Sequence, residues 1–72
     1  MSRWNPEEAA NNIAAQWEGT DPMRSIADVR RALAAMGDEV PRQHRASTLR
    51  ALLPKLCRDG MLVGRACARS RR

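Results

Sequence analysis

The sequence predicts a mainly α protein with a three-helix core and a short C-terminal β-strand or hairpin. Three stretches carry apolar residues at the spacing of amphipathic helices, and residues typical of helix starts precede the first two. The third stretch ends at Gly60, after which a short apolar run fits a strand better than more helix. At 72 residues the chain forms one domain at most. We expect residues 1–66 to form this domain and residues 67–72 to form a basic tail.

The first helix is expected to begin after Asn5, which suits an N-cap. Pro6 suits the first helical position and Glu8 is placed to complete a capping box. Gly19 is a natural stop. The apolar face of this helix comprises Ala9, Ala10, Ile13 and Trp17. Because alanines leave the face thin, another helix can approach it closely.

The second helix is expected to begin at Ser25, with Asp28 three residues later as an aspartate version of the capping box. Gly37 closes it, and Val40-Pro41 favours an extended connection. The buried stripe of this helix comprises Ile26, Val29, Leu33 and Met36.

The third helix carries the clearest division between an apolar and a basic face. Its apolar stripe comprises Leu49, Leu52, Leu53 and Leu56, and its opposite face comprises Gln43, His44, Ser47, Arg50, Pro54, Lys55 and Arg58. A proline inside a helix removes a hydrogen bond, but Pro54 lies on the outer side and the leucine stripe continues across it. This placement favours one helix kinked at Pro54 over two pieces that break at Leu53. Beyond Gly60, we expect residues 61–63 to form a strand.

The charge of the chain is divided between its two parts. Residues 1–40 carry four basic and seven acidic side chains, a balance of −3, whereas residues 41–72 carry nine basic and one acidic, a balance of +8. This asymmetry indicates a polyanionic partner on the C-terminal side, most simply nucleic acid, with a merely solvated basic surface as the alternative. Duplex DNA fits better than RNA, because the chain has no Phe or Tyr and only two Trp to stack on bases.

Catalysis and metal binding find little support in the sequence. The chain has one histidine, no phosphate-binding glycine loop and no carboxylate cluster. We therefore expect that the protein is not an enzyme and that it binds no cofactor and no small-molecule substrate. Cys57, Cys67 and His44 fall short of the four ligands of a structural zinc site. We expect two thiols in a reducing compartment. With no signal peptide and no apolar run near the roughly 18 residues of a membrane span, we expect a cytoplasmic protein.

The order of these elements resembles bacterial winged helix-turn-helix DNA-binding domains. The resemblance covers residues 24–66, where S-I-A-D-V-R-R-A-L is followed by S-T-L-R-A-L-L-P-K-L and then R-D-G-M-L-V-G-R. In that fold the third helix typically ends in a leucine pair, a charged residue and glycine before the first strand of the wing. The residues that match this ending are Leu53, Leu56, Asp59, Gly60, Leu62, Val63 and Arg65.

The resemblance implies that the outer face of the third helix enters the major groove of DNA. It makes residues near the start of that helix candidate base readers and the later basic residues candidate phosphate contacts. The expected nucleic-acid-binding residues are Arg42, Gln43, His44, Ser47, Arg50, Lys55, Arg58, Arg65 and Arg69. The implied function is that of a small transcriptional regulator or accessory factor of a bacterium or its phage.

Two further partners are consistent with the sequence. The acidic, alanine-rich first helix, with Trp4, Ile13 and Trp17, is a candidate interface for a homodimer or for a host protein. The alternative function is therefore a small helical module that docks on another protein, as phage-type inhibitors and antiactivators do.

Overall fold

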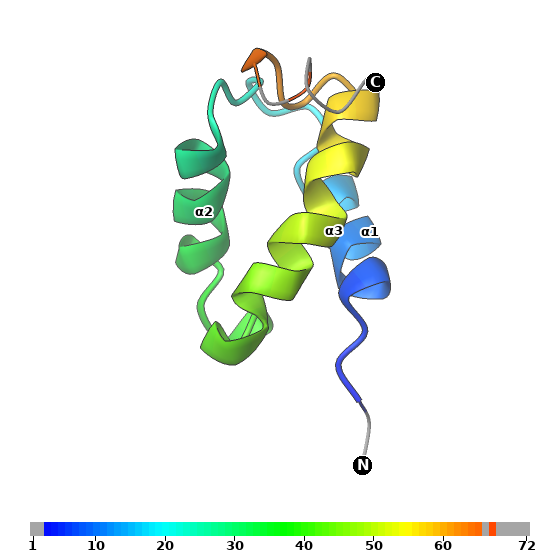
Figure 1. The fold of residues 1–72 in the computed structure, drawn as a ribbon, viewed down its shortest axis with the longest axis vertical. Coiled ribbons are helices and arrows are strands. Elements are labelled where there is room, and N and C mark those ends of the chain that lie inside the picture. Colours follow the sequence, from blue (N-terminus) through cyan, green and yellow to red (C-terminus); the bar gives the residue numbers. More distant parts are fainter. Residues whose placement is uncertain (1–2, 66, 68–72) are drawn as a thin grey trace.

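The computed structural model describes residues 3–65 and 67, which contain three α-helices. In the view of Figure 1, α1 and α2 lie on either side of α3. The helices are α1 (Pro6–Gln16), α2 (Ile26–Ala35) and α3 (Arg45–Arg58), and two 3-10 turns, η1 (Gly37–Glu39) and η2 (Arg42–His44), connect α2 to α3. The prediction of a mainly α protein is confirmed. No helix in the described ranges is long and apolar enough to cross a membrane.

The starts of the first two helices follow from their capping residues. The Asn5 side chain accepts hydrogen bonds from the backbone N–H groups of Glu7, at 3.1 Å, and Glu8, at 3.2 Å. The Ser25 hydroxyl accepts one from the N–H of Asp28 at 3.2 Å. These side chains satisfy N–H groups that have no partner inside their helix. Both predicted N-caps are confirmed.

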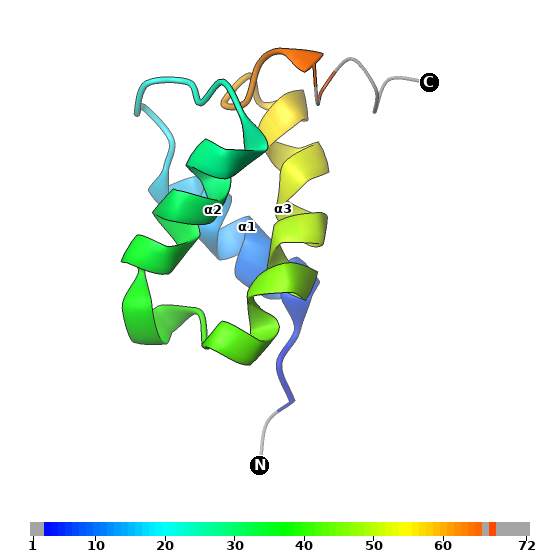
Figure 2. The same ribbon diagram turned by 60° about the vertical axis from the view of Figure 1, so that its left-hand side comes forward.

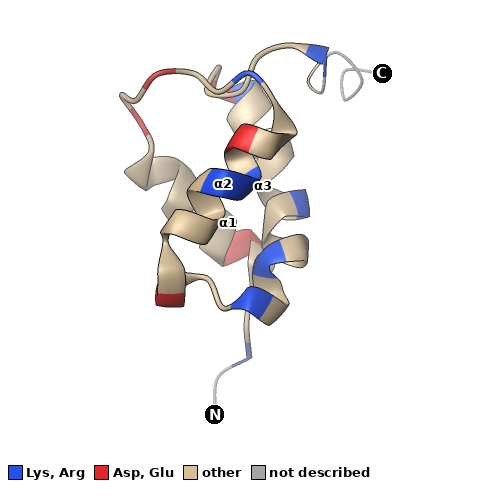
Figure 3. Ribbon diagram, turned by 90° about the vertical axis from the view of Figure 1, so that its left-hand side faces the viewer, with Lys and Arg blue, Asp and Glu red and all other residues tan. Residues whose placement is uncertain are grey.

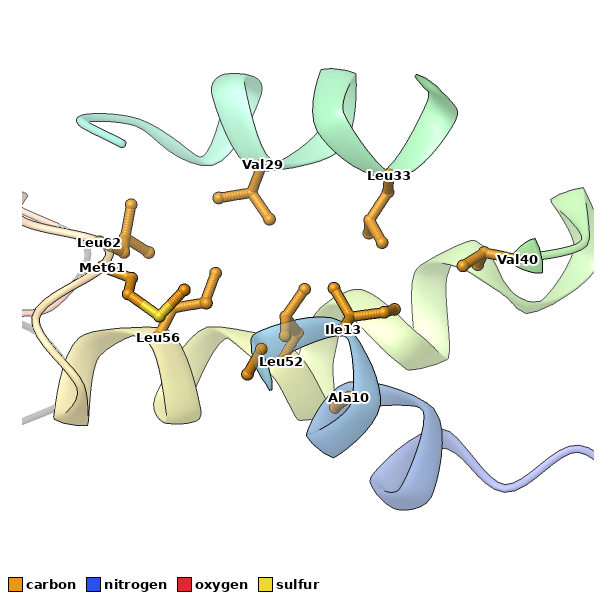
Figure 4. Packing of buried hydrophobic residues seen from close by; sticks show 10 residues of the cluster. Ala10, Ile13, Val29, Leu33, Val40, Leu52, Leu56, Met61 and Leu62 are labelled. Atoms are coloured by element: carbon orange, nitrogen blue, oxygen red, sulfur yellow. The ribbon is translucent and has the colours of Figure 1, made fainter. Parts of the chain in front are cut away.

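All three helices contribute to one core, in which the side chains of α2 point toward α1 and α3 (Figure 4). The buried apolar residues are Ala10, Ile13, Ala14, Val29, Leu33, Val40, Leu52, Leu56, Met61 and Leu62. Packing of α3 is more extensive on α1 than on α2, and Ala10 and Ala14 on α1 present little side-chain bulk to it. Within the predicted leucine stripe, Leu52 and Leu56 are fully buried, whereas Leu49 and Leu53 are only half-buried.

Helix α3 runs without interruption through Pro54, as the two ribbon views show (Figures 1 and 2). The proline side chain is exposed, on the side away from Leu52 and Leu56. The prediction of one helix, as opposed to two pieces that break at Leu53, is confirmed. Because proline has no N–H, the carbonyl of Arg50 lacks the usual i→i−4 partner at this turn.

Gly60 ends α3, as predicted, in the left-handed conformation with φ +77°. The N–H of Gly60 donates to the carbonyl of Cys57 at 3.2 Å, and the N–H of Met61 donates to the carbonyl of Leu56 at 2.8 Å. This pair of bonds is the Schellman motif, which satisfies carbonyls that the helix leaves without partners. It also directs Met61 and Leu62 back into the core.

The predicted C-terminal strand is wrong, because the chain after α3 forms only one isolated parallel bridge, between Met23 and Leu62. In this bridge the N–H of Met23 donates to Met61 O at 2.8 Å, and the N–H of Val63 donates to Met23 O at 3.0 Å. No strand is present in residues 3–65 and 67. The residues that would return as a second strand, 66–71, lie outside the described residues except for Cys67.

A disulfide joins Cys57 to Cys67, which corrects the expectation of two free thiols. It joins the last turn of α3 to a residue ten positions later, with the two Cα atoms 5.5 Å apart. Cys67, assigned to the tail from the sequence, is therefore bound to the folded domain.

Removing the disulfide is expected to destabilise the fold. A cross-link that closes a loop of this length lowers the entropy of the unfolded chain, so the double variant Cys57→Ala/Cys67→Ala should lose about 2–3 kcal/mol of unfolding free energy. Urea denaturation followed by circular dichroism measures the change. Reductant should lower the midpoint of the native chain to a similar extent and leave the variant unaffected. An unchanged midpoint of the native chain in reductant would contradict the prediction.

Replacing Pro54 by alanine is expected to stabilise the protein by about 1–2 kcal/mol. The alanine N–H can donate to the Arg50 carbonyl, and this gain exceeds the added entropy of the unfolded chain. Pro6→Ala is the matched control, since a proline at the first helical position displaces no hydrogen bond and its removal should bring no such gain. If the two substitutions change the free energy of unfolding equally in urea denaturation, Pro54 does not destabilise α3.

Candidate nucleic-acid interface

The outer face of α3 is a single exposed stripe. Ala46, Arg50, Pro54 and Arg58, each four residues from the next, are all exposed, whereas the opposite side of the helix is buried in the core. Arg50 and Arg58 are eight residues apart, which corresponds to about 12 Å along the helix axis. The stripe therefore presents two guanidinium groups on either side of a proline ring.

The connection before α3 extends this basic surface. Arg42 and Gln43 lie in η2 and are exposed, just ahead of the first turn of α3. Figure 3 shows basic residues on α2 and along α3, with acidic residues on α1, on α2 and on the connections. Exposed positive charge therefore continues from η2 onto the outer stripe of α3.

Most of these cations have no internal counter-ion. In the part of the chain that the structure describes, the ion pairs are Lys55 with Glu7, at 3.3 Å, and Arg31 with Asp28, at 4.0 Å. Arg42, Arg50, Arg58 and Arg65 are exposed and have no carboxylate within 4.0 Å among the described residues. Their charges are available to an anionic partner. Lys55 is only 17% exposed and already paired, so it is the least available of the predicted phosphate contacts.

Two of the predicted base readers have partners within the domain, and one of them, His44, contacts the N-terminal segment. The Trp4 ring stacks on His44, with 5.0 Å between ring centroids and 7° between ring planes. The Trp4 Nε1–H also donates to the hydroxyl of Thr48 at 2.9 Å, and the Ser47 hydroxyl donates to the His44 carbonyl at 3.2 Å. His44, beside Trp4, and Ser47 are half-buried, whereas Arg42, Gln43 and Arg50 are exposed. Arg69 lies outside the described residues.

The predicted partner residues on the first helix face inward to different degrees. Ile13 is 3% exposed and belongs to the core. Trp4 and Trp17 are half-buried and pack against that core. The apolar side of α1 is thus occupied by α3, and its outward side is polar, with Glu8, Asn11 and Asn12 exposed. In this fold Ile13 has no surface to offer a partner.

An open groove between α2 and α3 is a feature that the sequence interpretation missed. Its volume is about 630 Å³. The lining residues are Ile26, Arg30, Leu33, Arg42, Arg45, Ala46, Leu49, Arg50 and Leu53. Arg30 and Arg45 were not among the predicted site residues, because their neighbourhood depends on how two helices cross. The signal in the sequence was indirect: the leucine stripe of the third helix is wider than the part that the core buries, so Leu49 and Leu53 stay half-exposed.

The described residues contain no group of three or more His, Cys, Asp or Glu side chains that could hold a metal ion. Comparison of the chain with protein-family models, with curated proteins and with solved structures finds no match. The resemblance to winged helix-turn-helix domains therefore stays a prediction.

The hydrogen bond between Trp4 and Thr48 is expected to hold the N-terminal segment against α3. Thr48→Val keeps the shape of the side chain and Trp4→Phe keeps an aromatic ring, and each removes one partner of the bond, so a double-mutant cycle should give a coupling free energy of about 0.5–1.5 kcal/mol. Urea denaturation of the four proteins measures it. Strictly additive effects would show that the bond contributes no stability.

Proposed function

We propose that this chain binds duplex DNA through the exposed face of η2 and α3, as a small transcriptional regulator or accessory factor. The observation that supports this most strongly is the set of exposed arginines, Arg42, Arg50 and Arg58, that have no carboxylate partner in residues 3–65 and 67. Neutralising phosphates with such side chains releases the counter-ions of DNA, which is the main source of affinity in non-specific binding.

The shape of the surface is consistent with entry into the major groove. That groove admits one α-helix, and α3 has a solvent-facing side along its 14 residues. Its N-terminal half combines side chains suited to base edges, because Gln43 can pair with adenine and Arg50 with guanine through two hydrogen bonds each. Arg58 and Arg65, farther along, are suited to phosphates.

Pro54 limits the part of α3 that can read bases. It lies between Arg50 and Arg58 on the exposed stripe and offers no hydrogen-bond donor. In the proposed complex, base recognition is confined to η2 and the first half of α3. The second half of α3 contributes phosphate contacts and apolar contact with the major groove of DNA. Since His44 stacks on Trp4 and the Ser47 hydroxyl bonds to the His44 carbonyl, the principal candidate base readers are Gln43 and Arg50.

Titration of labelled duplex DNA at increasing salt tests the proposal. The full chain should bind at about 50 mM salt and lose affinity linearly on a log–log scale, with a slope of about 0.9 per phosphate neutralised. Arg58→Ala should weaken all duplexes alike and reduce the slope by about one, whereas Arg50→Ala should also reduce discrimination between sequences. Arg31→Ala is the control, because it removes an equal charge from an arginine of α2 that is paired with Asp28.

Absence of any binding at about 50 mM salt would refute the proposed function. Equal effects of Arg58→Ala and Arg31→Ala would show that the chain binds DNA by its net charge alone. Selection of preferred duplexes from a random pool, repeated with Arg50→Ala, measures the change in sequence preference.

A further inference from the structure

The groove between α2 and α3 has an apolar floor and a basic rim. Leu33 is fully buried at its base, and Ile26, Leu49 and Leu53 are half-buried along it. The rim and walls carry the four arginines Arg30, Arg42, Arg45 and Arg50, and no acidic side chain lines the groove. None of these arginines has a carboxylate within 4.0 Å in the described part of the chain. The groove thus combines exposed apolar surface with four uncompensated positive charges.

Arg45, which lines the groove, has a guanidinium group whose hydrogen bonds are incomplete. Its Nε atom is buried and has no hydrogen-bond acceptor among the described residues. Buried donors in native proteins are nearly always paired, because an unpaired donor costs about 1–3 kcal/mol. Arg45 begins α3 and lines the groove, so a carboxylate that enters the groove approaches a guanidinium whose hydrogen bonds are incomplete.

These features favour a protein segment over DNA as the occupant. A nucleic acid backbone would satisfy the arginines but would leave the leucines and the isoleucine without apolar partners. A helix with leucines on one side and glutamates beside them satisfies both, in the way that amphipathic helices occupy grooves of other proteins. From Ile26 to Leu33 the floor extends along seven residues of α2, about 10 Å, which accommodates two turns of such a helix.

We propose that the groove between α2 and α3 is a docking site for an acidic amphipathic helix of a partner protein, which anchors leucines between Ile26 and Leu53 and places its carboxylates against Arg30, Arg42, Arg45 and Arg50. The inference goes beyond DNA binding and does not depend on it. The groove would be the binding site in the alternative function, in which this chain docks on another protein. Because Arg42 and Arg50 belong to both surfaces, the partner helix and DNA compete for the same chain.

The probe is a fluorescein-labelled synthetic peptide of 16 residues, with leucines at positions i, i+4 and i+7 of one face and glutamates flanking them. Two control peptides replace the leucines by alanine or the glutamates by lysine. Fluorescence anisotropy with the full chain measures the dissociation constants. An interface of this small size belongs to the transient class, so we expect a constant on the order of micromolar for the first peptide and at least tenfold weaker binding for each control.

A matched pair of arginines on α2 locates the site. Arg30 lines the groove, whereas Arg31 is its neighbour, pairs with Asp28 and does not line it. Both are exposed, so neither substitution threatens the fold. Arg30→Gln should weaken the acidic leucine peptide about threefold to tenfold, and Arg31→Gln less than twofold. Thermal unfolding of the two variants verifies that both stay folded.

Three outcomes would overturn the inference. The first is that the acidic leucine peptide does not bind at concentrations up to about a millimolar, which is the weakest range of specific association. The second is equal binding of the leucine and alanine peptides, or equal effects of Arg30→Gln and Arg31→Gln, which would indicate attraction by net charge. The third is that Arg30→Gln weakens duplex DNA but not the peptide, which would make the groove part of a DNA surface. Peptide binding without any DNA binding would refute the proposed function and leave this inference intact.

Discussion

The burial of one side of α3 is the constraint on which the rest of the structure depends. Thr48, Leu52 and Leu56 on that side are fully buried, and α3 is the helix that packs against both others. A helix of 14 residues with this much apolar surface needs cover, and α1, α2 and the segment with Met61 and Leu62 supply it. The two helices cover α3 unequally, because the alanine face of α1 packs on it more extensively than α2 does. The looser packing of α2 leaves the groove between α2 and α3 open, and the side of α3 that neither helix covers is the exposed basic stripe.

Both ends of α3 are held by contacts outside the helices. Near its start, Trp4 stacks on His44 and bonds to Thr48. At its end, the Schellman motif at Gly60 and the disulfide between Cys57 and Cys67 fix the return of the chain. Small domains bury a modest fraction of their surface, and additional constraints of this kind commonly stabilise them. A helix held at both ends is also a rigid platform, which lowers the entropy that recognition of a partner costs.

The basic face and the basic groove share arginines but differ in what else they offer. The face around Gln43, Arg50 and Arg58 is polar and open, which matches the phosphates and base edges of DNA. The groove adds apolar surface from Ile26, Leu49 and Leu53, which a helix with leucines matches and DNA does not. A partner with such a helix would occupy two of the DNA-facing arginines. The two proposals together imply that the partners compete for Arg42 and Arg50.

Local features of the sequence determined the helices. Asn5 and Ser25 as caps, Gly60 as a stop and the leucine spacing of α3 depend on residues within a few positions of each other, so they are readable from the chain. The tertiary structure alone decided the rest. Pairing of Cys57 with Cys67 depends on the reversal after Gly60, and that reversal replaced the expected strand by a single bridge to Met23. Stacking of Trp4 on His44 and the convergence of Arg30 with Arg45 join residues that are far apart in the sequence. Such contacts follow from the way helices cross, which the spacing of apolar residues constrains only loosely.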